Sequence, residues 1–288
     1  MRPLMGEQIE RLAWRPLFLC VPFPPMVYSL DVVRKIRVSV FGLWCAALLL
    51  GWGGCADAGT LSLISNSRWV TVDRVYDGDT FRTIDGERVR LLGLNTPEVQ
   101  HRESAAEPLG DEATRALRTL IAGQVVRLEF DREKVDIYNR TLAQVYNRRG
   151  EWINGVMVEQ GWAHVYTFVP NLRWAKQLLR LERKARRRGA GIWSSERWQI
   201  LEVGMLNAKV LGQFRLVTGV VSRVGRRGRD FYMGGVHVTV PKRYRSYFTF
   251  PLPIERGDRV LVRGRVRSSG GGGWFVSLHA PTDWEMMP

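Results

Sequence analysis

An acidic pair separated by one glycine, Asp77 and Asp79, stands in a short polar stretch between apolar segments. Two carboxylates at this spacing can face one point, because Gly78 allows a sharp turn between them. Oxygen ligands of this kind suit Ca²⁺ or Mg²⁺ rather than Zn²⁺. The same tripeptide also occurs in ordinary turns, so it predicts a metal site only if other groups converge on it.

Two arginines and a glutamate further along the chain could act on a phosphate group near such a metal. Arg90 lies among apolar residues, and Arg140 follows a turn-forming stretch. A guanidinium binds two phosphate oxygens at once and keeps its charge at any working pH. Glu98 follows a proline in a loop, where it could take a proton from water. Together these groups match the needs of phosphodiester hydrolysis, although each alone is explained as a surface or salt-bridged residue.

The elements that would position these groups follow from the hydrophobic pattern. Residues 69–81 alternate as two strands around the acidic turn, and residues 84–87 predict a second tight turn before a strand at 89–92. The chain then leaves the sheet, because Pro97 cannot donate to a strand ladder. The metal and base candidates therefore lie at the two ends of one hairpin.

Further helices and strands complete one domain over residues 66–195. Apolar spacing predicts helices at 108–120, 154–160 and 171–188 and strands at 124–130 and 141–146. Asn154 is expected to cap the second of these helices. Five strands and three helices in this order predict an α+β fold built on a five-stranded OB-type β-barrel.

Residues 210–288 predict a small all-β domain without long helices. Strand patterns occur at 214–224, 236–240, 258–267 and 274–279. A second OB-like barrel is one architecture that these strands could form. Aromatic residues interleave with basic ones here, namely Phe231, Tyr232, Tyr244, Tyr247, Phe248 and Phe250. Such rings could stack single-stranded nucleic acid, but burial of most of them in a core is the simpler explanation.

The chain of 288 residues is strongly basic, with a formal charge of +15 and a pI near 10.4. This charge favours DNA or RNA as a partner over a merely solvated basic surface or an anionic lipid. Many of the basic residues lie on the helix at 171–188, where most should face solvent and could together hold a nucleic-acid backbone. The three cysteines all precede residue 56, which excludes a disulfide framework or Cys-ligated zinc in the rest of the chain.

Residues 1–58 predict a targeting segment. A basic cluster at 34–37 precedes an apolar run and an Ala-Asp-Ala sequence ending at Ala58, which is the pattern of a signal peptide. Cleavage there would export the protein to the periplasm or the cell exterior. An uncleaved apolar run, or a lipid on Cys55, would instead anchor it to the membrane. We expect translation to begin at Met26, because a signal peptide begins close to its basic cluster.

Three motifs in order resemble the staphylococcal nuclease (thermonuclease) family. They are Val75-Tyr76-Asp77-Gly78-Asp79-Thr80, Val89-Arg90-Leu91-Leu92-Gly93-Leu94-Asn95-Thr96-Pro97-Glu98 and Asp136-Ile137-Tyr138-Asn139-Arg140-Thr141-Leu142-Ala143. The resemblance continues to Gly191-Ile192-Trp193 and spans about residues 69–195. It implies the barrel fold of that family and a Ca²⁺-dependent endonuclease of DNA and RNA, here expected on single strands, that leaves 3′-phosphates.

The family's functional positions can be carried onto this chain residue by residue. For catalysis the resemblance implies two arginines and a glutamate, which fall on Arg90, Arg140 and Glu98. For the metal it implies Asp79 and the backbone carbonyl of Thr96, with Asp77 beside them.

Two positions depart from the family pattern. Asn95 stands where the family has a second metal-binding aspartate. Its amide oxygen can still bind Ca²⁺, but the lost charge should weaken the site or allow another divalent cation. Asn139 stands where glycine precedes the second arginine, and asparagine tolerates a left-handed turn. The weakened metal site leaves a second hypothesis open, a non-catalytic nucleic-acid-binding protein that keeps the barrel.

Overall fold

The computed structural model describes residues 66–100, 106–269 and 272–287. The predicted targeting segment, residues 1–58, lies outside these ranges. The described residues belong to one compact unit. Within them, no helix is long and apolar enough to cross a membrane.

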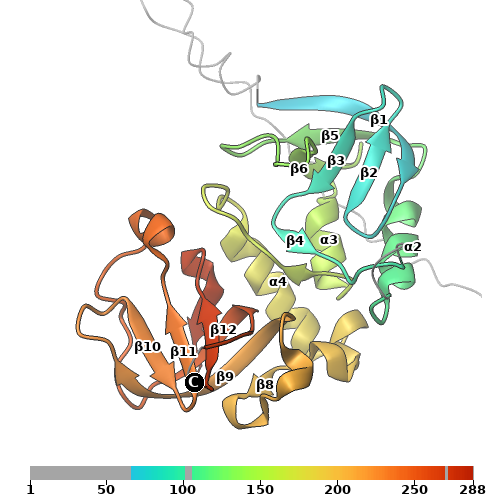
Figure 1. The fold of residues 1–288 in the computed structure, drawn as a ribbon. Coiled ribbons are helices and arrows are strands. Elements are labelled where there is room, and N and C mark those ends of the chain that lie inside the picture. Colours follow the sequence, from blue (N-terminus) through green and yellow to red (C-terminus); the bar gives the residue numbers. More distant parts are fainter. Residues whose placement is uncertain (1–65, 101–105, 270–271, 288) are drawn as a thin grey trace, which may run out of the picture. The chain divides into compact units, whose positions relative to one another are not determined.

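Five strands close the predicted barrel (Figure 1). They are β1 (Ser67–Val75), β2 (Thr80–Thr83), β3 (Arg88–Leu91), β5 (Val125–Glu129) and β6 (Thr141–Tyr146), in the order β1-β2-β3-β6-β5. Neighbouring strands are antiparallel except β3 and β6, and β5 pairs with β1 to close the ring. Alternate side chains such as Phe81, Val89 and Leu128 fill the core. The five-stranded barrel expected from the sequence is confirmed.

Among the described residues, three α-helices accompany the barrel, as the sequence predicts. They are α2 (Gly110–Ile121), α3 (Ile153–Glu159) and α4 (Ala175–Arg187). A pair of two-residue strands, β4 (Leu94–Asn95) and β7 (His164–Val165), forms a separate ladder that the sequence did not predict. This ladder ties the segment after β3 to the segment before α4.

The expected capping role of Asn154 is wrong. α3 begins after Trp152, and Asn154 is fully buried inside the first turn of the helix. Its side chain accepts a hydrogen bond from the Val145 N–H at 2.9 Å and donates to the Leu92 carbonyl at 3.0 Å. Asn154 therefore braces β6 and the end of β3 instead of satisfying the helix terminus.

The third helix begins later than expected. α4 begins at Ala175 rather than at residue 171. The Asn171 side chain accepts from the Glu133 N–H and donates to the Glu133 carbonyl, at 2.9 and 2.8 Å. Because Asn171 is used to fix a neighbouring loop, the helix starts only after it.

A second sheet follows the barrel and confirms the predicted C-terminal β structure (Figure 1). Its strands are β8 (Leu201–Glu202), β9 (Phe214–Val224), β10 (Asp230–Met233), β11 (Val236–Thr239), β12 (Arg259–Arg265), β13 (Arg267–Ser268), β14 (Trp274–Ser277) and β15 (Trp284–Met286). The order is β13-β14-β11-β10-β9-β12-β15, with β8 beside β9. The described helical turns before and within the sheet are 3₁₀ turns, η1 (Gly191–Ser194), η2 (Glu196–Trp198), η3 (Val203–Met205), η4 (Ala208–Val210), η5 (Lys242–Tyr247) and η6 (Pro281–Asp283).

The C-terminal sheet repeats the strand pairings of the barrel. β9, β10 and β11 form an antiparallel meander, β11 runs parallel to β14, and β12 pairs antiparallel with β9. In the barrel the same places are taken by β1, β2, β3, β6 and β5. β13, one residue after β12, pairs with β14. The strand order of the barrel therefore recurs in the C-terminal sheet.

Charged side chains join α4 to the C-terminal sheet. Arg263 of β12 pairs with the fully buried Glu182 of α4 at 3.0 Å. Glu285 of β15 pairs with Arg183 at 2.6 Å and with Arg186 at 3.1 Å. Part of the basic helix face that was expected to meet solvent or nucleic acid therefore binds this sheet.

Candidate active site

Asp79 lies in the turn between β1 and β2 and is almost fully buried. Its Oδ1 accepts hydrogen bonds from the Thr80 hydroxyl at 2.9 Å and from Arg90 Nη1 at 2.5 Å, and its Oδ2 accepts from the Thr96 N–H at 3.3 Å. A Cβ on Gly78 would lie 2.8 Å from the Thr96 side chain, so only glycine allows this approach. The turn thus brings the two ends of the predicted hairpin together.

Arg90 lies on β3 with its guanidinium held between two candidate metal ligands. Nη1 donates to Asp79, and Nη2 donates to Asn95 Oδ1 at 2.6 Å. The side chain is only 13% exposed, and a guanidinium removed from water needs such partners. Two of its five N–H donors make these bonds, which leaves others for a phosphate.

The β4–β7 ladder fixes the position of Asn95. Asn95 pairs with His164 across the ladder. Gly93, just before β4, has φ of +90°, and a Cβ there would lie 2.6 Å from Leu178 Cδ1. The Asn95 amide donates from Nδ2 to the Thr96 carbonyl at 2.9 Å. The carbonyl that the resemblance implies as a metal ligand is therefore already hydrogen-bonded by the residue that departs from the family.

Asp77 adds a second carboxylate to the turn. Its Oδ1 accepts from the Asp79 N–H at 2.9 Å. Burial and the adjacent charge of Asp79 raise the pKa of the Asp77 carboxyl to about 7. Two neighbouring carboxylates face only one guanidinium here, so their negative charge is not fully balanced. All the available ligand atoms are hard oxygens, so these residues fit a Ca²⁺-like cation. The described residues contain no cluster of three or more His, Cys, Asp or Glu side chains, so amide and backbone oxygens would complete the ligand set.

Glu98 lies in the exposed loop after β4, and its backbone is held by Glu107. The Glu98 N–H donates to Glu107 Oε2 at 3.2 Å, and the Glu98 carbonyl accepts from the Glu107 N–H at 2.8 Å. Arg197 of η2 donates to the other Glu107 carboxylate oxygen at 2.6 Å. Neither Glu107 nor Arg197 could be predicted from the motifs, because both residues lie outside them and 90 positions apart.

Arg140 occupies the turn before β6. Its N–H and Nε donate to the Asp136 carboxylate at 2.9 and 2.8 Å. Asn139 adopts the left-handed conformation that was predicted, with φ of +58°. Arg140 directly precedes β6, where Arg90 of β3 pairs with Leu142. Within the described residues, no hydrogen bond joins Arg140 to the Asp79 cluster, so the structure gathers the metal candidates and leaves this arginine apart.

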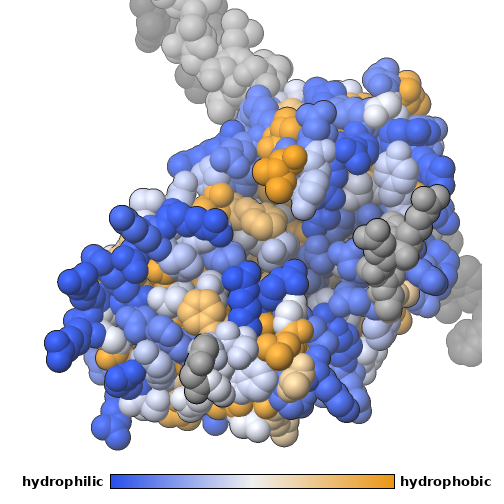
Figure 2. Space-filling model, viewed as in Figure 1, coloured by the Kyte–Doolittle hydropathy of each residue, from blue (hydrophilic) through white to orange (hydrophobic). Residues whose placement is uncertain are grey.

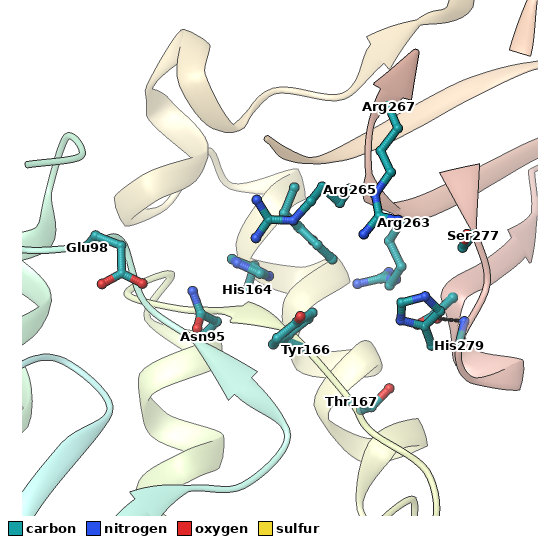
Figure 3. Close-up of a pocket in the computed structure, with 13 residues that line it drawn as sticks. Asn95, Glu98, His164, Tyr166, Thr167, Arg263, Arg265, Arg267, Ser277 and His279 are labelled. Carbon is teal, nitrogen blue, oxygen red and sulfur yellow. Dashed lines mark hydrogen bonds between the residues drawn. The ribbon is translucent and has the colours of Figure 1, made fainter. Parts of the chain in front are cut away.

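A pocket connects the candidate site with the C-terminal sheet (Figure 3). Asn95 and Glu98 line one side of it, and arginines of β12 and β13 line the other (Figure 3). These arginines are Arg263, Arg265 and Arg267. His164 also lines the pocket, and burial lowers its pKa to about 4, so it is neutral at working pH. The pocket therefore offers fixed positive charge next to the candidate base.

The barrel region is similar to known nucleases. A family profile described as "Staphylococcal nuclease homologue" matches residues 88–195. The thermonuclease of Staphylococcus hyicus is 31% identical over 170 residues, which cover 57% of this chain and 100% of that protein. The chain belongs to the staphylococcal nuclease family. The resemblance read from the three motifs is thereby confirmed.

Two further family members show the same range of similarity. The thermonuclease of Staphylococcus intermedius is 34% identical over 125 residues, which cover 42% of this chain and 74% of that protein. The SPbeta prophage-derived endonuclease YokF of Bacillus subtilis (strain 168) is 35% identical over 130 residues, which cover 43% of this chain and 44% of that protein. The family match ends at residue 195, before the C-terminal sheet.

Proposed function

We propose that this member of the staphylococcal nuclease family is a Ca²⁺-dependent endonuclease that hydrolyses phosphodiester bonds of DNA and RNA and leaves 3′-phosphates. The observation that carries the proposal is Arg90, held between Asp79 and Asn95 next to the segment that bears Glu98. Relatives named thermonuclease and endonuclease support it.

Glu98 acts as the general base. Its exposed carboxylate takes a proton from a water molecule, and that water attacks the phosphorus atom. The bond between phosphorus and the 5′-oxygen then breaks, the 5′-oxygen takes a proton from solvent to become a hydroxyl, and the phosphate stays on the 3′ side. A positioned general base contributes about 10²–10⁴-fold to the rate of such a step.

Arg90 and Arg140 neutralise the charge that develops on the phosphate. Both guanidinium groups are oriented by carboxylates, Asp79 and Asp136 respectively, which keeps them aimed without movement during the reaction. The N–H groups that these ion pairs leave unused can donate to the equatorial oxygens of the transition state. The β3–β6 pairing brings both arginines into one region of the barrel, because Arg90 pairs with Leu142, two residues after Arg140.

Asp77, Asp79, Asn95 and the Thr96 carbonyl would hold the divalent cation. A bound Ca²⁺ would lower the pKa of a coordinated water and offset phosphate charge. The chain itself keeps the four oxygen ligands in the β1–β2 turn and at the end of β4. The hydrogen bond between Asp79 and the Thr96 N–H holds these two segments together.

A cleavage assay tests the proposal. The full chain is incubated with single-stranded DNA in Ca²⁺ or in chelator, and the product ends are identified. We expect cleavage that requires the metal and yields 3′-phosphates. Cleavage in chelator, or 5′-phosphate products, would contradict the mechanism. Tight binding without cleavage in any divalent metal would instead favour the non-catalytic binding protein.

We also propose that the protein acts outside the cytoplasm, either free or anchored to the membrane. The basic cluster, apolar run and Ala-Asp-Ala sequence within residues 34–58 support this. Cell fractionation and N-terminal sequencing test it. Export with cleavage predicts a mature chain that begins at Gly59, and anchoring predicts the intact apolar run in the membrane fraction. A protein confined to the cytoplasm would contradict the proposal.

A further inference from the structure

One register row crosses the C-terminal sheet with rings in its middle and arginines at its ends. Tyr232 of β10 pairs with Arg223 of β9 on one side and with His237 of β11 on the other. His237 pairs with Phe275 of β14, and Phe275 pairs with Arg267 of β13. Because directly paired residues share a face of the sheet, these five side chains form a continuous line. We call it the aromatic row.

The rings of the aromatic row contact one another. The rings of Tyr232 and His237 are stacked, with centroids 4.4 Å apart and planes at 6°. Those of His237 and Phe275 meet edge-on at 5.8 Å. The Arg223 guanidinium lies 4.1 Å from the Tyr232 ring centroid. Such contacts hold the rings at defined angles, so that a ligand would not have to order them.

The aromatic row lies on the outer face of the sheet and not in the core. Tyr232, His237 and Phe275 are partly exposed, whereas Phe231 and Val238 on the opposite face are buried. Of the rings singled out from the sequence, Phe231 belongs to the core, and Tyr244, Phe248 and Phe250 pack against it. Core packing therefore explains most of the expected platform but leaves the aromatic row unexplained.

Positive charge frames these rings. Arg223 and Arg267 are exposed at the two ends of the aromatic row, and Arg226 and Arg227 are exposed in the β9–β10 turn beside it. The acid next to the row, Asp230, is engaged with His237 Nε2 at 3.2 Å. Figure 2 shows hydrophilic side chains over most of the visible face, with only small, separate apolar areas. The surroundings suit a polyanion more than an apolar protein partner.

We propose that the aromatic row binds single-stranded nucleic acid. Unpaired bases pack against the exposed edge of the stacked Tyr232 and His237 rings and against Phe275, while Arg223 and Arg267 bind the flanking phosphates. A duplex hides its base faces and cannot use the rings. β10 and β11 take the places in the strand order that β2 and β3 take in the OB-type barrel, and OB-folds bind oligonucleotides on their second and third strands.

The aromatic row also leads toward the candidate active site. Arg267, at its end, lines the pocket that Asn95 and Glu98 line from the other side (Figure 3). A strand bound on the row can therefore continue into that pocket, where Arg265 adds positive charge. This continuation rests on the proposed nuclease function, whereas strand binding by the row does not.

Strand binding is measured on the full chain carrying Glu98→Gln, in chelator, with fluorescent oligothymidine. Tyr232→Ala and Phe275→Ala should each weaken binding by about 5–100-fold, the loss expected for one stacked base. Tyr232→Trp, which keeps a ring, should retain affinity. Arg223→Ala should reduce the slope of log affinity against log salt by about 0.7.

Two exposed residues outside the aromatic row serve as matched controls. Trp69→Ala, which removes an exposed ring of β1, and Arg256→Ala should leave affinity within about twofold of the parent. Equal affinities for parent and row variants, or equal losses for row and control variants, would overturn the proposal. Cleavage by the chain with Glu98 intact reports on the nuclease separately. If the row variants lose affinity but the parent does not cleave, only the proposed nuclease function is contradicted. If the parent cleaves but the row variants bind as tightly as the parent, only this proposal is contradicted.

Discussion

At the scale of single residues, the candidate site is a set of hydrogen bonds that share one guanidinium. Arg90 meets both Asp79 and Asn95, so the residue expected to clamp phosphate also offsets charge in the metal turn. The motif order predicts that these residues act together. It does not predict that the Asn95 amide donates a hydrogen bond to the Thr96 carbonyl, because that bond depends on the backbone conformation of the short strand β4.

Asn95→Asp tests this arrangement. The substitution adds a negative charge and removes the Nδ2 donor, which frees the Thr96 carbonyl. We expect the Ca²⁺ concentration for half-maximal cleavage to fall by about tenfold, equivalent to about 1.4 kcal/mol. The exposed cap substitution Asn207→Asp adds the same charge elsewhere and should leave calcium dependence unchanged. Identical calcium titrations of Asn95→Asp and the parent would show that residue 95 is not a ligand.

At the scale of elements, long periodic segments were predictable and short ones were not. The barrel strands and the three helices follow from alternation and helical spacing in their own residues. β4 and β7 have only two residues each, so no periodicity can reveal them. Asn154 and Asn171 carry helix-start signals, but their side chains bond to distant backbone groups instead. Local sequence patterns were therefore misleading where a side chain makes a tertiary contact instead of the local one.

Gly93→Ala tests how the β3–β4 turn positions the site. Gly93 and Gly123 both have positive φ, at +90° and +68°, but only Gly93 faces a neighbour, Leu178 Cδ1 at 2.6 Å from an added Cβ. Each alanine should lose about 1–2 kcal/mol for the backbone strain. Gly93→Ala should lose about 1–3 kcal/mol more for overpacking and most of its cleavage activity. Urea unfolding and cleavage rates measure both, and equal behaviour of the two variants would exclude a positioning role for this turn.

At the scale of the whole molecule, ion pairs between α4 and the C-terminal sheet dock two β structures onto each other. The composition shows an excess of basic residues, which favours nucleic acid as a partner. Composition could not predict that Glu182 pairs with Arg263 and that Glu285 pairs with Arg183 and Arg186. The sheet residues of these pairs lie far from α4 in sequence. The basic helix therefore has a structural role as well as any role in binding.

Glu285→Gln tests this docking. Burial raises the pKa of Glu285, but Arg263 and Arg186 outweigh it, so the net pKa is lowered. The ionised form thus stabilises the fold above the unfolded pKa, and this stability is lost as the pH falls below about 4.5. We expect Glu285→Gln to lose about 3 kcal/mol at neutral pH and to show a smaller loss on acidification than the parent.

The surface pair of Glu202 with Arg259 offers a control for that experiment. Both side chains are nearly half exposed, so Glu202→Gln should lose less than about 1 kcal/mol. Urea unfolding at neutral and acidic pH compares the three proteins. A neutral-pH loss for Glu285→Gln no larger than that for Glu202→Gln would contradict a stabilising interface.

The central claim is that Glu98 activates the water in a nuclease centre organised by Arg90. The most direct test compares cleavage of single-stranded DNA in Ca²⁺ by the parent, by Glu98→Gln and by the half-exposed control Glu112→Gln, with DNA affinity measured for each. We expect Glu98→Gln to lose about 10²–10⁴-fold in cleavage rate, while affinity and the Glu112→Gln rate stay near those of the parent. Parent-like cleavage by Glu98→Gln would contradict it.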